Sequence, residues 1–322
     1  MRAQFITNIK NKSSHRIFMI PKLLLISILL LAFSYQTFNQ EVIRFAVIGD
    51  FGWESKEAED VANLVKSWKP DFVLTTGDDN YDYGEDSTID INIGQYYSEF
   101  IAPYFGKFGK GDTINRFFPT LGNHDWRVAG AVPYLKYFTL PGNERYYDFV
   151  KGPVHFFALD TDKHEPDGNT DTSKQAQWLK ERLSSSTSVW KIVYLHHAPY
   201  SSGKDHGNFP PAQWHFKEWG ANVVLSGHEH LYERLMIDSL LYLVNGSGGR
   251  SLYTFAKPIE GSHVRYCEDY GAQIVTASKD SITFQFYTRN DSLVDSYTLY
   301  NMKTSDITIP DDEMIPPAPA AD

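Results

Sequence analysis

The chain has 322 residues, which is enough for one large domain or two small ones. Hydrophobic residues make up 42% of the sequence and aromatic residues 15%, which excludes a disordered chain. The formal net charge is −10, and a surface of that sign repels nucleic acid, so the composition excludes a duplex-binding protein.

The N-terminus has the features of an export signal. The first 34 residues carry five basic side chains and no acidic one, and Leu23–Phe33 is an apolar run. Ala32-Phe33-Ser34 offers small residues spaced for cleavage, so residues 1–34 are predicted to be the signal peptide of a secreted or periplasmic protein. The run is shorter than the roughly 20 residues of a membrane span, so we expect no stable membrane association after cleavage. The alternative is an uncleaved anchor, because Ile17–Ile20 lies just upstream of Pro21-Lys22.

The sequence then alternates strand, helix and strand. Residues 42–48 form a nearly all-apolar run that ends at Gly49-Asp50. Residues 55–68 place apolar side chains on one face of a helix, and residues 72–74 begin a second buried strand that ends at Gly77-Asp78. This pattern predicts a βαβ unit with an acid at the carboxyl end of each strand. In open α/β sheets, that edge is where ligands bind.

The same alternation returns after residue 150. Residues 154–159 are a predicted strand, residues 174–183 a predicted helix, and residues 191–195 and 222–225 two further strands. Four predicted strands therefore end at or beside a potential ligand: Asp50, Asp78, His196 and His228.

The last third predicts five short strands between turns: 240–244, 264–266, 273–276, 282–287 and 293–299. Asn290-Asp291-Ser292 is typical of a hairpin connection. We expect these strands to form a second sheet packed on the first, in one α/β domain of two mixed sheets flanked by helices over residues 35–302. Residues 303–322 are rich in Pro and Asp and predict a flexible tail. Cys267 is the only cysteine, so the chain has no internal disulfide.

Five short blocks carry the candidate ligands, and each alone is a weak signal: Gly49-Asp50-Phe51-Gly52, Gly77-Asp78-Asp79-Asn80-Tyr81, Gly122-Asn123-His124-Asp125, Val193-Tyr194-Leu195-His196 and Gly227-His228-Glu229-His230. Hard cations take oxygen and imidazole ligands, and the Asp78 carboxylate can bridge two of them. Two ions about 3.5–4 Å apart can hold a phosphoryl group and generate a hydroxide. The glycines at 49, 77, 122 and 227 are expected to let the backbone turn sharply, so that the side chains point into one cavity.

In this order, the blocks resemble the calcineurin-like metallophosphoesterases, and within them the purple acid phosphatases. In that subfamily a tyrosine follows the bridging aspartate by three residues, as Tyr81 follows Asp78. The resemblance covers about residues 42–300 and implies an αββα sandwich. The overall layout of the chain is similar to that of the small, tartrate-resistant acid phosphatases. Residues 227–234, in contrast, are more similar to the larger plant-type enzymes.

The resemblance also implies roles for single residues. Asp50, Asp78, Tyr81 and His230 would hold Fe³⁺, and Tyr81 as a phenolate would give a purple or pink colour. Asp78, Asn123, His196 and His228 would hold a second, divalent ion, which would be Fe²⁺, Zn²⁺ or Mn²⁺. His124 would face the substrate as a phosphate binder or general acid, and His206 resembles a second substrate-side histidine. His197, Asp79, Asp125 and Asp160 are not expected to bind metal.

The function implied is that of an acid phosphatase that hydrolyses phosphate monoesters with a metal-bound hydroxide. Its substrates would be small-molecule or protein-linked phosphate esters, and the protein is expected to act as a monomer. A phosphodiesterase or nucleotidase on the same scaffold is the first alternative, because the ligand sets are nearly shared. A metal-binding scaffold protein without turnover, and a redox role of a paired iron site, are the others.

Overall fold

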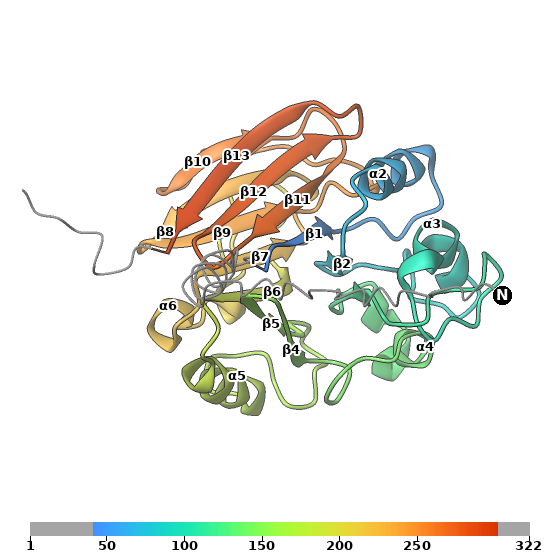
Figure 1. The fold of residues 1–322 in the computed structure, drawn as a ribbon, viewed down its shortest axis with the longest axis horizontal. Coiled ribbons are helices and arrows are strands. Elements are labelled where there is room, and N and C mark those ends of the chain that lie inside the picture. Colours follow the sequence, from blue (N-terminus) through green and yellow to red (C-terminus); the bar gives the residue numbers. More distant parts are fainter. Residues whose placement is uncertain (1–40, 302–322) are drawn as a thin grey trace, which may run out of the picture. The chain divides into compact units, whose positions relative to one another are not determined.

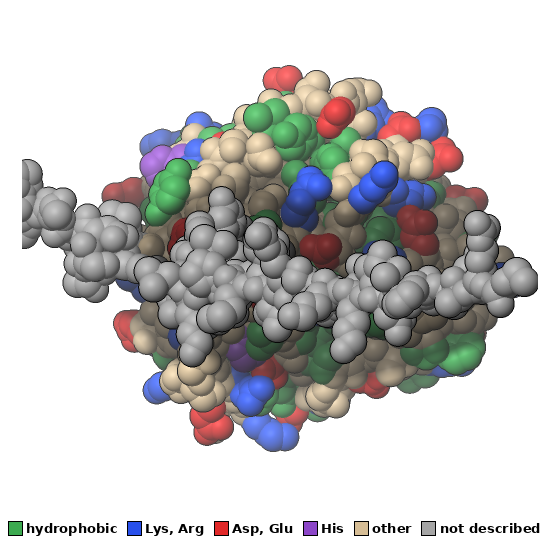
Figure 2. Space-filling view, in the orientation of Figure 1, with side chains coloured by type: hydrophobic (Ala, Val, Ile, Leu, Met, Phe, Trp, Pro, Cys, Tyr) green, Lys and Arg blue, Asp and Glu red, His purple; other side chains and the backbone are tan. Residues whose placement is uncertain are grey.

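The computed structural model describes residues 41–301, which form two β-sheets with helices beside them (Figure 1). The predicted signal peptide and the predicted C-terminal tail lie outside the described residues. The predicted fold class, two mixed sheets flanked by helices, is therefore confirmed. On the face drawn in Figure 2, the visible basic and acidic side chains are interspersed.

The first sheet combines the beginning and the end of the described chain. Its strand order is β13-β12-β11-β1-β2-β3. The central strand β1 pairs in parallel with β2 and antiparallel with β11, where Ile43 lies opposite Ala277. The strands are β1 (Ile43–Ile48), β2 (Phe72–Thr75), β3 (Phe117–Phe118), β11 (Gly271–Ala277), β12 (Ser281–Thr288) and β13 (Leu293–Tyr300).

The second sheet has the order β10-β8-β9-β7-β6-β5-β4. Strands β5, β6, β7 and β9 are parallel neighbours, and antiparallel strands complete both edges. The strands are β4 (Tyr147–Lys151), β5 (Val154–Ala158), β6 (Trp190–His197), β7 (Val223–Gly227), β8 (Tyr232–Ile237), β9 (Leu240–Asn245) and β10 (Ser262–Tyr266).

Two amphipathic helices begin at serine caps. The Ser55 hydroxyl accepts the N–H of Ala58 at the start of α2 (Lys56–Ser67), and Ser173 caps α5 (Lys174–Ser185) in the same way. Both predicted helices are thus confirmed. Shorter helical segments are η1 (Asp90–Gly94), α3 (Gln95–Tyr97), η2 (Ser98–Phe100), η3 (Asp125–Arg127), η4 (Ala129–Ala131), α4 (Val132–Tyr137), η5 (Pro210–Ala212) and α6 (Phe216–Trp219). Within residues 41–301, no helix has the length and apolar character needed to cross a membrane.

The core is built largely from aromatic side chains. Phe45 of β1 stacks on Phe72 of β2, and both meet Phe156 of β5 edge-on, so these rings join the two sheets. A second apolar cluster contains Leu179 and Leu183 of α5 together with residues of the second sheet. Aromatic pairs of this geometry add to the stabilisation that burial alone provides.

One expectation about the sheets is wrong. The last third of the chain does not form a sheet of its own, because β11–β13 extend the sheet of β1–β3 while β8–β10 join the sheet of β4–β7. The pairing of β1 with β11 joins residues more than 200 positions apart, and local hydrophobic periodicity carries no information on it. The predicted hairpin connection is confirmed, since β12 and β13 pair across Asn290-Asp291-Ser292.

Candidate metal centre

The candidate ligands meet because parallel strands of both sheets end at the same place. Asp50 follows β1 and Asp78 comes three residues after β2, whereas His196 lies near the end of β6 and His228 follows β7. One ligand atom each of Asp50, Asp78 and His196 lie within 4.8 Å of one another. The carboxyl ends of strands from two different sheets therefore frame one site.

The first group of ligand atoms surrounds Tyr81. Its hydroxyl lies 3.1 Å from Asp50 Oδ1 and 3.1 Å from His230 Nε2, and His230 Nε2 lies 3.3 Å from Asp50 Oδ1. Tyr81, Asp50 and His230 are all buried. These are three of the four residues assigned to the ferric ion.

The second group surrounds His196. Its Nε2 lies 3.1 Å from Asn123 Oδ1, 3.1 Å from His228 Nδ1 and 3.5 Å from Asp78 Oδ2. Through Asp78 this group adjoins the first, so all seven predicted ligand side chains lie in one connected cluster. That they bind metal stays a prediction.

Two backbone carbonyl groups orient the histidines. His196 Nδ1 lies 2.8 Å from the Thr76 carbonyl oxygen, and His230 Nδ1 lies 2.6 Å from that of Ser251. Because a carbonyl oxygen only accepts, each Nδ1 carries a hydrogen and each Nε2 is left to face the centre. A hydrogen on His196 Nε2 could be donated to only one of its neighbours Asn123 Oδ1, His228 Nδ1 and Asp78 Oδ2. A metal ion, by contrast, accepts a lone pair from every ligand around it. The donor set therefore fits bound metal ions.

The electrostatics of the site also favour cations. Burial lowers the pKa of His196, but the carboxylates of Asp78 and Asp50 outweigh it and raise that pKa overall. Burial, together with Asp125, raises the pKa of Asp79 well above its usual value. Burial and Asp78 raise the pKa of Asp125 to about 7. Buried carboxylates held this close repel one another, and bound cations would offset that repulsion.

The glycines act differently from the expectation. The sharp turns lie mainly at the ligands themselves, because Asp50, Asp78 and His228 have positive φ angles of 55°, 55° and 68°. Of the four glycines, only Gly77 has a positive φ. The others allow close approach instead: a Cβ on Gly122 would lie 2.2 Å from Asp78 Oδ1, and one on Gly49 2.1 Å from Thr76 Oγ1. Left-handed backbone at non-glycine residues is costly and is typical of functional sites.

His124 and His206 occupy the exposed side of the ligand cluster. His206 is exposed, and its ring stacks on that of His228 with centroids 3.9 Å apart. His124 is partly buried, with Nε2 3.9 Å from Asp78 Oδ2 and Nδ1 2.6 Å from the Asp82 carbonyl oxygen. Both predicted substrate-side histidines therefore lie beside ligand residues.

Residues not expected to be ligands mostly have identifiable structural contacts. Asp125 Oδ2 accepts the N–H groups of Gly122 and Asp79 and so ties two ligand loops together. Asp160 Oδ2 accepts the Trp126 indole N–H. His197 has contacts of both kinds. One of its ring nitrogens lies within 4.8 Å of ligand atoms of His196 and His228, and its Nδ1 forms a hydrogen bond with the Thr161 hydroxyl.

Glu229 was missed by sequence reasoning. This buried carboxylate lies between the two ligand histidines of its loop and accepts the backbone N–H groups of His206, at 2.7 Å, and of Gly207. It therefore positions the loop that carries His206. Its place inside the block from Gly227 to His230 was the available signal, but nothing in the sequence indicated its partners.

We expect Glu229→Gln to loosen that loop, because hydrogen bonds to a charged acceptor are stronger than those to an amide. Backbone N–H exchange at His206 and Gly207 should become faster, and turnover should fall about tenfold. Hydrogen-exchange mass spectrometry and initial rates measure the two effects. The matched control is Glu218→Gln, at an exposed glutamate of α6. Unchanged exchange in the Glu229 variant would contradict this role.

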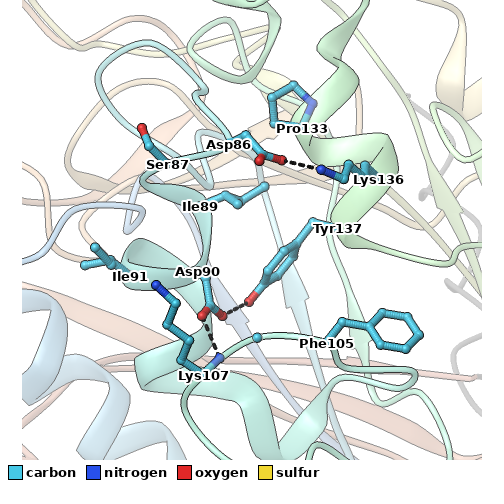
Figure 3. Close-up of a pocket in the computed structure, with 11 residues that line it drawn as sticks. Asp86, Ser87, Ile89, Asp90, Ile91, Phe105, Lys107, Pro133, Lys136 and Tyr137 are labelled. Atoms are coloured by element: carbon cyan, nitrogen blue, oxygen red, sulfur yellow. Dashed lines mark hydrogen bonds and ion pairs between the residues drawn. The ribbon is translucent and has the colours of Figure 1, made fainter.

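One cavity is lined by none of the predicted ligands (Figure 3). Its volume is about 590 Å³, and both of its carboxylates already have partners. Asp86 pairs with Lys136 at 3.1 Å, and Asp90 accepts from the Tyr137 hydroxyl and the Lys107 N–H, both at 2.8 Å. This cavity therefore presents no converging set of free ligands.

Comparisons with known proteins point to one family. The family described as calcineurin-like phosphoesterase matches residues 43–232, a range that contains all seven predicted ligands. Purple acid phosphatase 17 of Arabidopsis thaliana is 28% identical over 65% of this chain and 69% of its own length. Purple acid phosphatase 15 of the same plant is 26% identical over 64% of this chain, and acid phosphatase type 7 of Mus musculus is 25% identical over 63%. The matches cover only 45% and 50% of these last two proteins, so the chain spans about half their length.

Solved structures share the fold. Purple acid phosphatase PPD1 from yellow lupin (Lupinus luteus) seeds superimposes with a TM-score of 0.67 at 18% identity, covering 81% of this chain and 54% of that one. GAP50, described as the anchor in the inner membrane complex of Plasmodium, gives a TM-score of 0.65 at 20% identity over 81% of this chain and 90% of its own. At such identities the likeness concerns the fold alone.

Proposed function

This chain belongs to the calcineurin-like phosphoesterase family, and we propose that it is an acid phosphatase that hydrolyses phosphate monoesters at a binuclear metal centre. The observation that carries the proposal is the convergence of seven side chains from strand ends of both sheets and from the loops that follow them. Tyr81 at the middle of the first group of ligands favours the purple acid phosphatase branch, the name that both Arabidopsis relatives carry.

The metal assignment is part of the proposal. Asp50, Asp78, Tyr81 and His230 would hold Fe³⁺, and Asp78, Asn123, His196 and His228 would hold Fe²⁺, Zn²⁺ or Mn²⁺. When bound, such a pair supplies Lewis acidity for the phosphoryl oxygens and activates water at mild pH. The carbonyl groups of Thr76 and Ser251 keep the histidine nitrogens aimed for this role.

Two histidine side chains of this protein would assist the departure of the leaving oxygen. His124 and His206 lie beside the ligand cluster, and either imidazole can bind a phosphoryl oxygen or donate a proton to the departing oxygen. The Asp82 carbonyl oxygen accepts from His124 Nδ1, which aims His124 Nε2 toward Asp78. We also propose that the enzyme is exported, on the features of residues 1–34, and that it acts as a monomer.

Replacing His124 tests the proton-donor role. His124→Ala should slow turnover of an alkyl phosphate, which needs a proton on its leaving oxygen, by about 100-fold or more. A nitrophenyl phosphate, whose leaving group departs unprotonated, should be affected much less. Initial rates across a series of leaving groups measure the difference. An equal loss for both esters would assign His124 to phosphate binding, and no loss would remove it from the reaction.

The proposed function is tested by initial rates on an aryl phosphate monoester and on the matching diester. The protein loaded with iron and zinc should prefer the monoester, and a chelator should abolish the activity. A preference for the diester would keep the metal centre but assign the enzyme to the phosphodiesterases. Turnover of neither ester would favour a binding protein.

A further inference from the structure

The side chain of Arg250 lies over the ring of the predicted ligand Tyr81. Its guanidinium carbon is 5.4 Å from the centroid of the Tyr81 ring and 4.3 Å from that of the Trp53 ring. Arg250 Nη2 also pairs with Asp82 Oδ1 at 3.1 Å. One arginine therefore contacts two aromatic rings and the residue that follows Tyr81 in the chain.

The backbone around Arg250 is anchored on the metal centre. The Arg250 N–H donates to the Asp50 carbonyl oxygen at 3.0 Å, and the Gly248 N–H donates to that of Gly49 at 2.9 Å. A Cβ on Gly248 would lie 2.4 Å from the Gly49 carbonyl oxygen, so the two segments are closely packed. The arginine side chain therefore begins at a point that is fixed against the loop of Asp50.

Asp82 connects Arg250 with His124 as well as with Tyr81. Its carboxylate accepts from Arg250, and its carbonyl oxygen lies 2.6 Å from His124 Nδ1. The centroids of the Tyr81 and His124 rings are 4.4 Å apart. The ion pair of Arg250 with Asp82 therefore holds the segment that carries one predicted ligand and orients one substrate-side histidine.

The charge of Arg250 also acts on the Tyr81 ring. A cation above an aromatic ring is attracted to its negative face. The attraction is larger for a phenolate, because a full negative charge then faces the guanidinium. Arginine keeps its charge at every relevant pH, and its planar group can stack on a ring. A positive charge in this place lowers the energy of the phenolate electrons.

We propose that Arg250 is a positioning residue for Tyr81, which holds its ring in place and sets how readily the phenolate donates electrons to a bound ferric ion. This inference rests on the proposed function and adds to it a residue that is not a metal ligand. Groups around a ligand tune a metal centre in this way. The Asp82 carboxylate would weaken the effect, because it partly neutralises the guanidinium.

The test is the position of the visible absorption band of the iron-loaded protein. Arg250→Gln removes the charge and should move the band to longer wavelength, because the phenolate then donates its electrons more readily. Asp82→Asn leaves the guanidinium without its anionic partner and should move the band to shorter wavelength. Arg250→Lys keeps the charge and loses the planar group, so its band should lie between those of Arg250→Gln and the wild type.

The matched control is Arg289→Gln. The Arg289 guanidinium lies 5.2 Å from the centroid of the Tyr270 ring and pairs with Asp269 at 2.8 Å. None of its ion-pair partners within residues 41–301 is a predicted ligand, so this variant should keep the band of the wild type. A variant that merely loosens the site would move the band in the same direction for Arg250→Gln and Asp82→Asn, whereas a charge effect moves it in opposite directions.

Amide exchange of the metal-free protein measures the positioning without iron. The Tyr81 N–H donates to the Gly52 carbonyl oxygen at 2.8 Å, and the Gly84 N–H donates to that of Asn80 at 3.0 Å. Both amides should exchange faster in Arg250→Gln, because the ion pair that holds this segment is lost.

Unchanged exchange, or a band that moves in neither variant, would overturn the inference. An iron-loaded wild type without a visible band would overturn it as well, since no phenolate would then face the ion. A protein that shows both expected shifts but hydrolyses no phosphate ester would instead refute the proposed function and leave this inference standing.

Discussion

Asp78→Asn is expected to abolish metal-dependent phosphatase activity. Asp78 Oδ2 lies 3.5 Å from His196 Nε2, and one Asp78 oxygen lies within 4.8 Å of ligand atoms of both Asp50 and His196, so its carboxylate can serve both metal positions. Replacing residues that merely support a metal ligand costs about 10–100-fold in affinity or activity, so losing the shared ligand should cost more than about 100-fold. Initial rates and elemental analysis of the same samples measure the loss.

The stability of this variant should also fall without metal. Burial raises the pKa of Asp78, but His196 and His124 outweigh burial and hold that pKa below its usual value. The ionised carboxylate therefore stabilises the folded protein at neutral pH, and its removal should lower the thermal midpoint of the metal-free protein. Metal binding to the folded state alone stabilises it, so the gain in midpoint on adding metal should shrink in the variant. Calorimetry with and without chelator measures both effects. A variant that retains two metal ions and a rate within tenfold of the wild type would show that Asp78 is not shared.

Tyr81→Phe is expected to remove the visible colour of the iron-loaded protein. Burial and the neighbouring carboxylates of Asp50 and Asp78 raise the pKa of Tyr81 well above its usual value, so without a cation the phenol stays protonated. A phenolate therefore forms only against a strongly positive ion, and its absorption band reports ferric iron at this position. The variant should lose the band completely.

The matched control is Tyr83→Phe, since Tyr83 is two residues away and 59% exposed. That variant should keep the colour of the wild type. Visible absorption spectra of the three iron-loaded proteins measure the effect. Colour that persists in Tyr81→Phe would show that another group accounts for it, and an iron-loaded wild type without colour would place Tyr81 outside the metal centre.

The sequence predicted the local elements and the strand ends that carry candidate ligands, because both depend on short patterns. The alternation from residue 42 to 78 placed Asp50 and Asp78 at strand ends, and β1, α2 and β2 are found there. His196 and His228 were located in the same way, at the ends of β6 and β7. The spacing of Asp78 and Tyr81 then indicated the family.

What the sequence did not predict depends on contacts between distant segments. Strand β1 pairs with β11 only when the chain has folded. The same is true of the hydrogen bond that the Glu229 carboxylate accepts from the His206 N–H. The prediction that these glycines supply the sharp turns was wrong, because the left-handed φ angles fall on Asp50 and His228 rather than on Gly49 and Gly227. A Cβ atom at Gly49 or Gly227 would collide with neighbouring atoms. Close packing of this kind produces no periodic pattern in a sequence.

The central claim is that these seven side chains hold two metal ions. Its most direct test is the metal content per chain of the purified, iron- and zinc-loaded protein, measured together with the specific activity of the same samples. The account predicts two ions per chain, one of them ferric, and activity that appears only as the second ion binds. Full activity with one ion or none would contradict it.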